Sequence, residues 1–249
     1  KARFFILWFL ASALVITLVS PTIPTLKTVV VHSRETCDRD IVSVLDASGS
    51  MRGPFWGDQE SGITKFEALR DTHYAFAKER NGDCFTTVLF SGRQGRGARY
   101  PEKERGYAFV ANSFVKDPEE LILPLKEGIG EENPASLLGQ FSQGTEISEG
   151  FVVADKFLKE ASTAKTKALI LISDLGNEIK DNERALATLK SIIDQGTSAY
   201  IFGVDPYKDD QFYKDIRALE DIGKLHYFEV QSKEDMARAY DIIGRLEPS

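Results

Sequence analysis

The chain is poor in the residues and motifs on which zinc proteins, nucleotide-binding proteins and many hydrolases depend. Its 249 residues include two cysteines and three histidines. The histidines, His32, His73 and His226, are widely scattered and no Cys-x-x-Cys pair occurs, so a zinc site is not expected. Gly-x-Gly-x-x-Gly and P-loop patterns are absent, which argues against a nucleotide site. The Gly-x-Ser-x-Gly motif of many serine hydrolases is also missing.

Basic residues are outnumbered by acidic ones. There are 31 Lys and Arg against 38 Asp and Glu, so the formal net charge is −7. Because nucleic-acid binding requires a basic surface, nucleic acid is not an expected partner. The length suits one large domain with some residues left over, and no internal repeat or low-complexity tract is present.

One long apolar run stands near the start of the chain. Residues 4–19 carry no charge, and Lys1 and Arg3 precede them. A cleaved signal peptide, a buried core helix and a transmembrane helix would each explain this run. We favour the transmembrane helix, because a core helix would be unusually apolar on all sides. Residues 1–26 are therefore predicted to be a membrane helix and its exit, with residues 4–20 in contact with lipid.

The charges on the two sides of this run predict the membrane topology. Lys1 and Arg3 favour a cytoplasmic N-terminal side, which places the following domain outside the cytoplasm. Lys27 and Arg34 on the other side weaken the argument. Residues 27–39 are interpreted as a connector, and the chain is expected to continue before Lys1.

The two cysteines bear on the same question of compartment. Cys37 precedes the first predicted strand and Cys84 precedes the second, at the same end of two strands that should be neighbours. A disulfide between them would fit an oxidising compartment. Two buried free thiols are the alternative.

Strand-like and helix-like patterns alternate along the rest of the chain. The predicted strands are residues 41–45, 84–90, 107–110, 168–173, 198–204 and 226–230. The predicted helices are residues 64–80, 117–126, 144–160, 182–195, 211–221 and 233–246. Such alternation predicts an α/β fold with a doubly wound, mostly parallel sheet, here spanning residues 40–249. The basic segment 91–105 is interpreted as a solvated insertion between strands. Alternatively, it is an exposed basic loop that binds an acidic partner.

A short polar motif follows the first predicted strand. Asp46, Ser48 and Ser50 occupy alternate positions after an apolar run, and Gly49 allows a sharp turn between them. A carboxylate and two hydroxyls suit a hard divalent cation such as Mg²⁺, which prefers oxygen ligands and keeps several waters. The motif alone is a weak indication, since such residues also form ordinary turns.

Two further segments strengthen the metal interpretation. Asp174 follows the most hydrophobic predicted strand, and Thr145 stands at the start of a predicted helix, where its hydroxyl could alternatively serve as a cap. Ligands of open parallel sheets bind at the carboxyl ends of the strands, where the strand order reverses. The predicted metal ligands are Asp46, Ser48, Ser50, Thr145 and Asp174.

These segments resemble the von Willebrand factor A domain family and its metal-ion-dependent adhesion site. The family's Asp-x-Ser-x-Ser motif matches DASGS at residues 46–50, and the Met that often follows is Met51. Its threonine matches Thr145 in GTEI, and its second aspartate matches Asp174 in ISD. Family members often have Gly after that aspartate, whereas this chain has Leu175, so the loop backbone is expected to differ there.

The resemblance covers residues 40–246 and is strongest to bacterial membrane-anchored Bat-type proteins. Shared features are the membrane segment, the exit at Ser20-Pro21, the RDI run at residues 39–41 and the ending AYDIIGRLEPS. The resemblance implies a Rossmann-like fold, a bacterial inner-membrane location with a periplasmic domain, and association with a MoxR-type AAA+ ATPase. It also implies that helix 233–246 moves and that a further membrane helix follows Ser249.

Three functions compete on this basis. The leading hypothesis is a non-enzymatic, membrane-anchored interaction module whose Mg²⁺, or alternatively Mn²⁺ or Ca²⁺, binds an acidic group of a partner protein. The second is a structural subunit of a membrane complex, held mainly by its membrane helix, with the metal site unused for ligand binding. A hydrolase using Asp46, Asp174 or Ser48 is disfavoured, because no histidine or lysine lies in the motif segments to act as a base.

Overall fold

The computed structural model describes residues 36–92, 108–126, 144–220 and 224–246. The predicted membrane helix and exit, residues 1–26, lie outside these ranges, as do residues 93–105 of the basic segment. No helix within the described ranges combines the length and the apolarity that a bilayer crossing requires. Thr36 to Ser249 form one compact unit, which contains all of the described residues.

A six-stranded sheet forms the centre of this unit. The strands are β1 (Arg39–Asp46), β2 (Cys84–Phe90), β3 (Ala108–Val110), β4 (Thr166–Ser173), β5 (Ser198–Val204) and β6 (Leu225–Val230). Their order is β3-β2-β1-β4-β5-β6, and every neighbouring pair is parallel except β2 and β3. This arrangement confirms the predicted α/β fold with a mostly parallel, Rossmann-like sheet.

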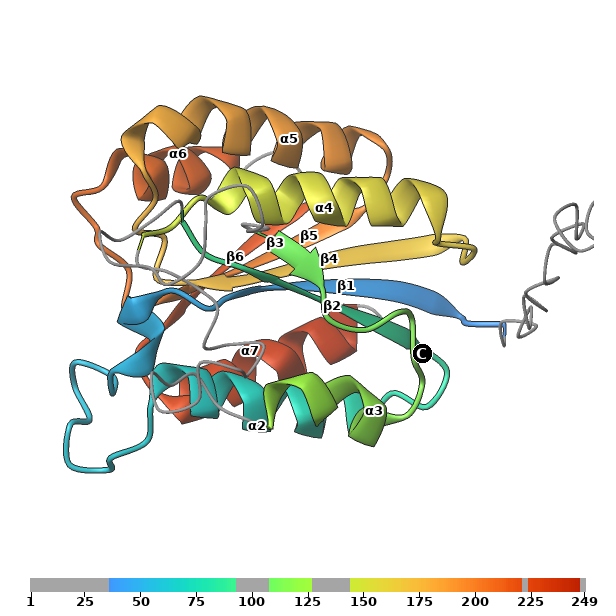
Figure 1. Cartoon of the computed structure of the whole chain (residues 1–249), viewed down its shortest axis with the longest axis horizontal. Helices are drawn as coiled ribbons and strands as arrows, with labels where there is room; N and C mark the ends of the chain where they lie inside the picture. The colour runs from blue at the N-terminus through green and yellow to red at the C-terminus, as the bar shows by residue number, and fades with distance from the viewer. Residues whose placement is uncertain (1–35, 93–107, 127–143, 221–223, 247–249) are drawn as a thin grey trace, which may run out of the picture. The chain divides into compact units, whose positions relative to one another are not determined.

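Helices cover both faces of the sheet. On one face lie α4 (Ile147–Glu160), α5 (Asn182–Asp194) and α6 (Gln211–Leu219). On the other lie α2 (Lys65–Lys78), α3 (Pro118–Ile122) and α7 (Lys233–Leu246) (Figure 1). The doubly wound architecture therefore has three layers, with the strands in the middle.

The central strands are apolar on both sides because both faces are covered. All eight residues of β1 are buried, and alternate side chains enter different cores. Ile41 and Leu45 pack under α2 and α7, whereas Val42 and Val44 pack under α4 and α5. This two-residue alternation into two cores explains why the strand is a nearly continuous hydrophobic run rather than an alternating one.

The boundaries of several helices follow from local capping. Thr64 and Glu67 form a capping box at the start of α2, each side chain accepting the other's backbone N–H. The predicted helix 117–126 divides into α3 and a 3₁₀ turn, η3 (Leu123–Leu125), because Pro124 cannot donate a helical hydrogen bond. The ends of the other predicted helices and strands agree with the structure to within three residues.

The two cysteines are joined where the described chain enters the sheet. Cys37 and Cys84 form a disulfide with their Cα atoms 5.6 Å apart. Asp40 lies beside the two sulfur atoms, which would suggest a metal site if the sulfurs were thiolates. Its carboxylate instead accepts hydrogen bonds from the backbone N–H groups of Thr163 and Ala164, at 2.9 and 3.0 Å. The Asp40 carboxylate therefore links the start of β1 to the loop before β4.

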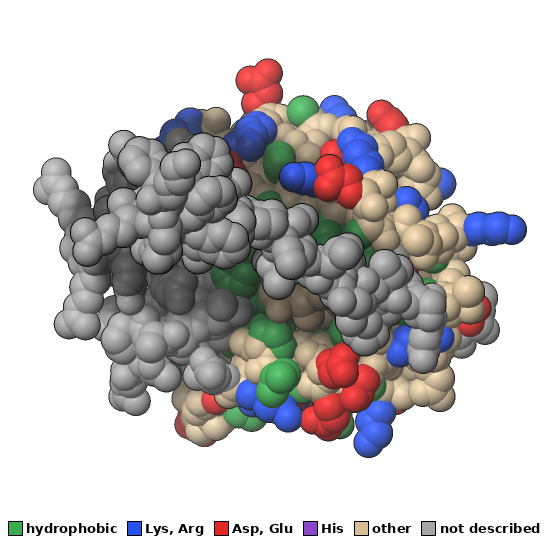
Figure 2. Space-filling model, turned by 45° about the vertical axis from the view of Figure 1, so that its right-hand side comes forward, with side chains coloured by type: hydrophobic (Ala, Val, Ile, Leu, Met, Phe, Trp, Pro, Cys, Tyr) green, Lys and Arg blue, Asp and Glu red, His purple; other side chains and the backbone are tan. Residues whose placement is uncertain are grey.

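Charged side chains are mixed over the molecular surface shown in Figure 2. Lys and Arg alternate with Asp and Glu across the described parts of this face, without a large region of one sign. A mixed surface fits the modest net charge of the chain.

Candidate metal centre

The sheet brings the first and second aspartates together at the point where the strand order reverses. β1 and β4 are neighbours, yet the chain leaves β1 toward β2 and leaves β4 toward β5, on opposite sides. Asp46 is the last residue of β1, and Asp174 directly follows β4. Loops that diverge in this way leave a crevice, which is where open α/β sheets bind ligands.

Asp46 is fully buried and held by two hydrogen bonds. Its Oδ1 accepts from the backbone N–H of Ser48 at 2.8 Å, and its Oδ2 accepts from the hydroxyl of Ser173 at 2.6 Å. The pKa of Asp46 is raised to about 7, first by burial and then by the like charge of Asp174, although both serines oppose the rise. Two carboxylates so placed repel each other, and a bound cation would relieve that repulsion.

The two motif serines lie side by side in a tight turn. The hydroxyl oxygens of Ser48 and Ser50 are 3.0 Å apart. Ser48 precedes the 3₁₀ turn η1 (Gly49–Arg52) but its side chain does not cap it, so the hydroxyl is not committed to the turn. Ser48 is buried and Ser50 is exposed, whereas Met51 is buried and anchors the turn in the core. A group bound by these hydroxyls would therefore face solvent on one side.

Thr145 is placed by contacts of its backbone. The N–H of Gly92, just after β2, donates to Gly144 at 2.6 Å, and the N–H of Glu178 donates to Thr145 at 3.0 Å. A Cβ on Gly92 would lie only 2.5 Å from the backbone nitrogen of Thr145, so this approach requires glycine. Gly144 has a φ of +103°, a conformation that also favours glycine. Sequence reasoning missed both glycines, although a Gly after a strand and before the key threonine was a usable indication.

The alternative role of Thr145 as a helix cap is wrong. Helix α4 begins at Ile147, three residues later than predicted, and its N-cap is Glu146, with no side-chain cap bond. The left-handed turn at Gly144 delays the helix. In place of a cap, Asn177 accepts a hydrogen bond from the N–H of Ile147 at 3.0 Å. This bond ties the start of α4 to the loop that follows β4.

The loop after β4 carries Asp174 in an unusual backbone setting. Oδ1 of Asp174 accepts a hydrogen bond from the N–H of Gly176 at 3.1 Å. Leu175 between them has a φ of +60°, in the left-handed region where glycine is usual, and its side chain is fully buried. The leucine therefore adopts a backbone conformation suited to glycine and compensates by packing in the core.

The donor set fits a hard divalent cation. Carboxylate and hydroxyl oxygens alone make up the five predicted ligands, the chemistry that Mg²⁺, Mn²⁺ and Ca²⁺ share. Among the described residues, the Thr145 hydroxyl and Oδ2 of Asp174 have no hydrogen-bond partner, so both remain available to a ligand. Asp46 and Asp174 supply the negative charge, and Ser48, Ser50 and Thr145 supply neutral oxygens.

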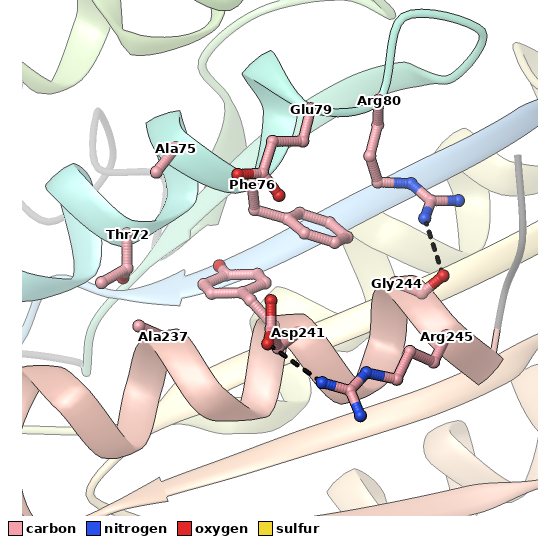
Figure 3. A pocket seen from close by; sticks show the side chains of 10 residues that line it. Thr72, Ala75, Phe76, Glu79, Arg80, Ala237, Asp241, Gly244 and Arg245 are labelled. Atoms are coloured by element: carbon pink, nitrogen blue, oxygen red, sulfur yellow. Dashed lines mark hydrogen bonds and ion pairs between the residues drawn. The ribbon is translucent and has the colours of Figure 1, made fainter.

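A separate pocket lies between α2 and α7, away from these residues. It has a volume of about 410 Å³ and is lined by Phe76 and Tyr240, whose rings stack with centroids 4.6 Å apart. Figure 3 shows Arg80, two residues beyond the end of α2, donating to the carbonyl of Gly244. The donor and acceptor are 3.4 Å apart. The pocket contains none of the predicted metal ligands.

Comparisons of sequence identify no relative. No family model matches the chain, and no curated protein matches it.

Solved structures, in contrast, share the fold. An aerotolerance-related membrane protein from Bacteroides fragilis superposes with a TM-score of 0.58 at 15% identity, covering 83% of this chain and 96% of that one. BatB from Bacteroides thetaiotaomicron gives a TM-score of 0.58 at 17% identity, covering 84% of this chain and 99% of that one. The pilus adhesin SpaC from Lactobacillus rhamnosus GG gives 0.58 at 14% identity, covering 85% of this chain and 30% of that one.

These likenesses concern the fold, because the sequence identities are low. They agree with the topology described above and with the resemblance carried by the three sequence segments. The chain thus has a von Willebrand factor A-like fold, of the kind found in Bat-type aerotolerance proteins.

Proposed function

We propose that this domain is a divalent-metal-dependent protein-interaction module that binds an acidic group of a partner protein. The observation that carries the proposal is the placement of Asp46 and Asp174, two buried carboxylates at the switch point between β1 and β4. The adjacent hydroxyls of Ser48 and Ser50 complete a set of hard oxygen donors beside them. Thr145 adds a third hydroxyl from the segment just before α4.

The charge of this donor set leaves room for a partner. The two carboxylates match the charge of a divalent cation, but they do not fill its coordination shell. The remaining ligands are neutral hydroxyls and water. A carboxylate from outside can therefore replace a water on the exposed side, near Ser50. When bound, the cation supplies the attraction for that carboxylate, and Mg²⁺ is the proposed ion, with Mn²⁺ and Ca²⁺ as alternatives.

The setting of the module is proposed to be the periplasmic side of a bacterial inner membrane, anchored through residues 1–26. Its structural neighbours include an aerotolerance-related membrane protein and a pilus adhesin, which supports an interaction role near a membrane. The disulfide between Cys37 and Cys84 suits an oxidising compartment. A MoxR-type ATPase is the partner system suggested by the sequence resemblance alone.

We further propose that the module is not an enzyme. Two histidines fall within the described residues, and both are packed elsewhere. His73 is buried against Tyr240 between α2 and α7, and His226 stacks on Tyr200 at a centroid distance of 5.2 Å. Neither is among the residues that surround Asp46 and Asp174, which supports binding rather than acid–base chemistry at the site.

Capture of partners from detergent-solubilised membranes tests the metal hypothesis. The native chain would be used as bait in Mg²⁺ or in EDTA, beside Asp46→Ala and the control Glu183→Ala, which removes an exposed carboxylate on α5. Partners that are lost both in EDTA and with Asp46→Ala, but kept with Glu183→Ala, are the expected result. A set of partners unchanged by all three treatments would favour the structural-subunit alternative.

A further inference from the structure

Exposed apolar side chains gather on the loops around the candidate metal centre. Seven large hydrophobic side chains are exposed among the described residues. Three of them, Trp56, Ile179 and Tyr207, lie in the connections that follow β1, β4 and β5 at the carboxyl edge of the sheet. Trp56 is 55% exposed and Tyr207 is 49% exposed. Aromatic residues left exposed in this way are common anchors of protein interfaces.

Trp56 and Tyr207 form two walls of a pocket. Their ring centroids are 5.3 Å apart and their planes meet at 76°, nearly a right angle. The rest of the lining of this pocket, whose volume is about 320 Å³, comes from Asp205, Pro206, Lys208, Asp209 and Gln231. This volume is at the lower end for small-molecule sites, so it suits one or two side chains rather than a cofactor. We call this feature the aromatic pocket.

The aromatic pocket adjoins the candidate metal centre through Gly176. A Cβ placed on Gly176 would lie 3.4 Å from Oδ1 of Asp174 and also 3.4 Å from Cδ2 of Tyr207. The carboxylate of a predicted metal ligand and the tyrosine ring therefore both pack against the same residue. An extended peptide advances roughly 3.3–3.6 Å per residue, so two nearby residues of one segment can reach both places.

The tryptophan is held in place by a buried polar group. Oδ2 of Asp205, just after β5, accepts a hydrogen bond from the backbone N–H of Trp56 at 2.8 Å. The same oxygen lies 3.3 Å from Nζ of Lys65, and that ammonium is 5.2 Å from the centroid of the Trp56 ring. Asp205 adopts a φ of +44°, an uncommon conformation for a residue other than glycine. Because the wall is already ordered, a ligand would lose little entropy in ordering it.

The charges around the pocket are mixed. The buried ammonium of Lys65 lies beside the Trp56 ring, and Lys208 lines the pocket itself. Asp205 is already paired with Lys65, and Lys208 is paired with Glu229 at 2.7 Å. Asp209 is an exposed acid of the lining outside these two pairs, so the aromatic walls, rather than the charges, favour an apolar group.

We propose that the aromatic pocket binds an apolar side chain, such as Leu, Met or Phe, that lies one or two residues from the metal-bound acidic residue in an extended segment of a partner protein. This inference rests on the proposed function, because it requires the acidic residue to be held at the metal centre. It adds a second anchor, and it defines the recognised segment by two side chains rather than by charge alone.

A peptide array with a fixed glutamate tests the inference. Each peptide would carry Leu, Ala or Lys at one position within two residues of the glutamate, and the full chain would be bound in Mg²⁺ or in EDTA. Binding that requires Mg²⁺ and is about tenfold tighter for Leu than for Ala or Lys, at one such position, is expected. Equal Mg²⁺-dependent binding of the Leu, Ala and Lys peptides would overturn the proposed role of the aromatic pocket and leave the proposed function standing.

Variants of the full chain separate the two sites. Trp56→Ala and Tyr207→Ala should abolish the preference for Leu but retain Mg²⁺-dependent binding of the glutamate, whereas Asp46→Ala should abolish binding to every peptide. Leu123→Ala, which trims another exposed apolar side chain on η3, is the matched control and should keep the preference. A preference that survives in both aromatic variants would overturn the inference. Loss of Mg²⁺ dependence for all peptides would overturn both proposals.

Fluorescence gives a readout that does not depend on affinity. The chain has two tryptophans, so Trp8→Phe leaves Trp56 as the sole indole reporter. A Leu-containing peptide should shift the Trp56 emission to shorter wavelength as the ring leaves water, and the matched Ala peptide should not. An emission unchanged by a bound Leu peptide would place the peptide elsewhere and overturn the inference.

Discussion

Asp46 illustrates how a single buried carboxylate links stability, pH and metal. Its folded-state pKa of about 7 lies above the ordinary value of 3.8, chiefly because burial disfavours the charged form and Asp174 adds a like charge. The folded state therefore holds the proton more tightly than the unfolded chain. The stability that Asp46 contributes is fully present below pH 3.8 and is lost as the pH rises through 7.

The variant Asp46→Asn should show this effect directly. In EDTA at pH 8 we expect the melting temperature of the variant to exceed that of the native protein by several degrees, because asparagine cannot ionise, and we expect the gap to shrink by pH 5. Millimolar Mg²⁺ should stabilise the native protein at pH 8 and leave the variant unchanged, since ligand binding shifts stability by mass action. Thermal unfolding at both pH values, with and without Mg²⁺, is the measurement. An Mg²⁺ shift of equal size in both proteins would contradict the assignment of Asp46 as a ligand.

At the scale of elements, the loops are held together at points where backbone meets backbone. Gly92 after β2 approaches the Gly144–Thr145 segment so closely that no side chain fits between them. Glu178 after β4 holds the other side of Thr145. The position of the Thr145 hydroxyl thus depends on three segments that are distant in the sequence.

Gly92→Ala should therefore disturb the candidate metal centre through the backbone of Thr145. The added methyl group would push the Thr145 segment away, and we expect a loss of roughly 1–3 kcal/mol in unfolding free energy, typical of overpacking. The stabilisation by Mg²⁺ should also fall. Gly53→Ala is the matched control, because a Cβ there meets only a carbonyl oxygen at 3.9 Å and its φ of −82° suits alanine. Chemical unfolding with and without Mg²⁺ checks both, and an undiminished Mg²⁺ effect in Gly92→Ala would contradict the positioning role.

The contact between α2 and α7 is the second element-scale feature with a pH consequence. Nδ1 of His73 on α2 is 2.9 Å from the hydroxyl of Tyr240 on α7, and both side chains are buried. Burial lowers the pKa of His73 to about 4, below the ordinary value of 6.5. The stability it contributes is fully present above pH 6.5 and is lost as the pH falls toward 4.

The double variant His73→Phe/Tyr240→Phe should resist acid better than the native protein. Both phenylalanines keep the aromatic packing, and neither leaves a polar partner unsatisfied. Between pH 7.5 and 5 we expect the native protein to lose about 2 kcal/mol through His73 relative to the variant. Urea unfolding at the two pH values measures the difference. The contribution of Asp46 to stability changes with pH in the direction opposite to that of His73, and it is the same in both proteins. The comparison therefore isolates the contact between His73 and Tyr240. Parallel pH profiles of the two proteins would contradict this prediction.

On the scale of the whole molecule, the disulfide closes the entry to the domain. Cys37 and Cys84 are 47 residues apart in sequence, and the bond joins the segment before β1 to the first residue of β2. Such a link restricts the unfolded chain, and a loop of this length corresponds to about 4 kcal/mol in the chain-entropy description, with 2–4 kcal/mol typical.

Replacement of both cysteines by serine should cost about 2–4 kcal/mol in unfolding free energy without changing the fold. Urea unfolding of the native protein with and without reductant should reproduce that loss, and reductant should not affect the variant. Mass mapping without reduction gives the control for the bond itself. Two free thiols in protein from native membranes would remove the support for an oxidising compartment.

Local pattern alone was enough for much of this architecture. The apolar runs that end at Asp46 and at Ser173, and the amphipathic helices between them, predict an alternating α/β chain because burial on both faces of a parallel strand demands continuous hydrophobicity. The same reasoning placed both aspartates at strand ends. Asp46, Ser48, Ser50, Thr145 and Asp174 stay predicted ligands, now with free oxygens at Thr145 and Asp174 to accept a cation.

Only the tertiary structure decided which segments, distant in the sequence, are neighbours in the fold. Strand order put β1 against β4, and backbone contact with Gly92 placed Thr145. The glycine permits that contact, but the packing of the whole domain determines which segment approaches it. The left-handed Leu175 is tolerated because its side chain fills the core, which no local pattern reveals. The aromatic pocket brings together Trp56 and Tyr207, separated by 151 positions in the chain, and Gly176 lies between Tyr207 and Asp174 of the candidate metal centre. Long-range packing makes such juxtapositions, and a sequence read in order does not display them.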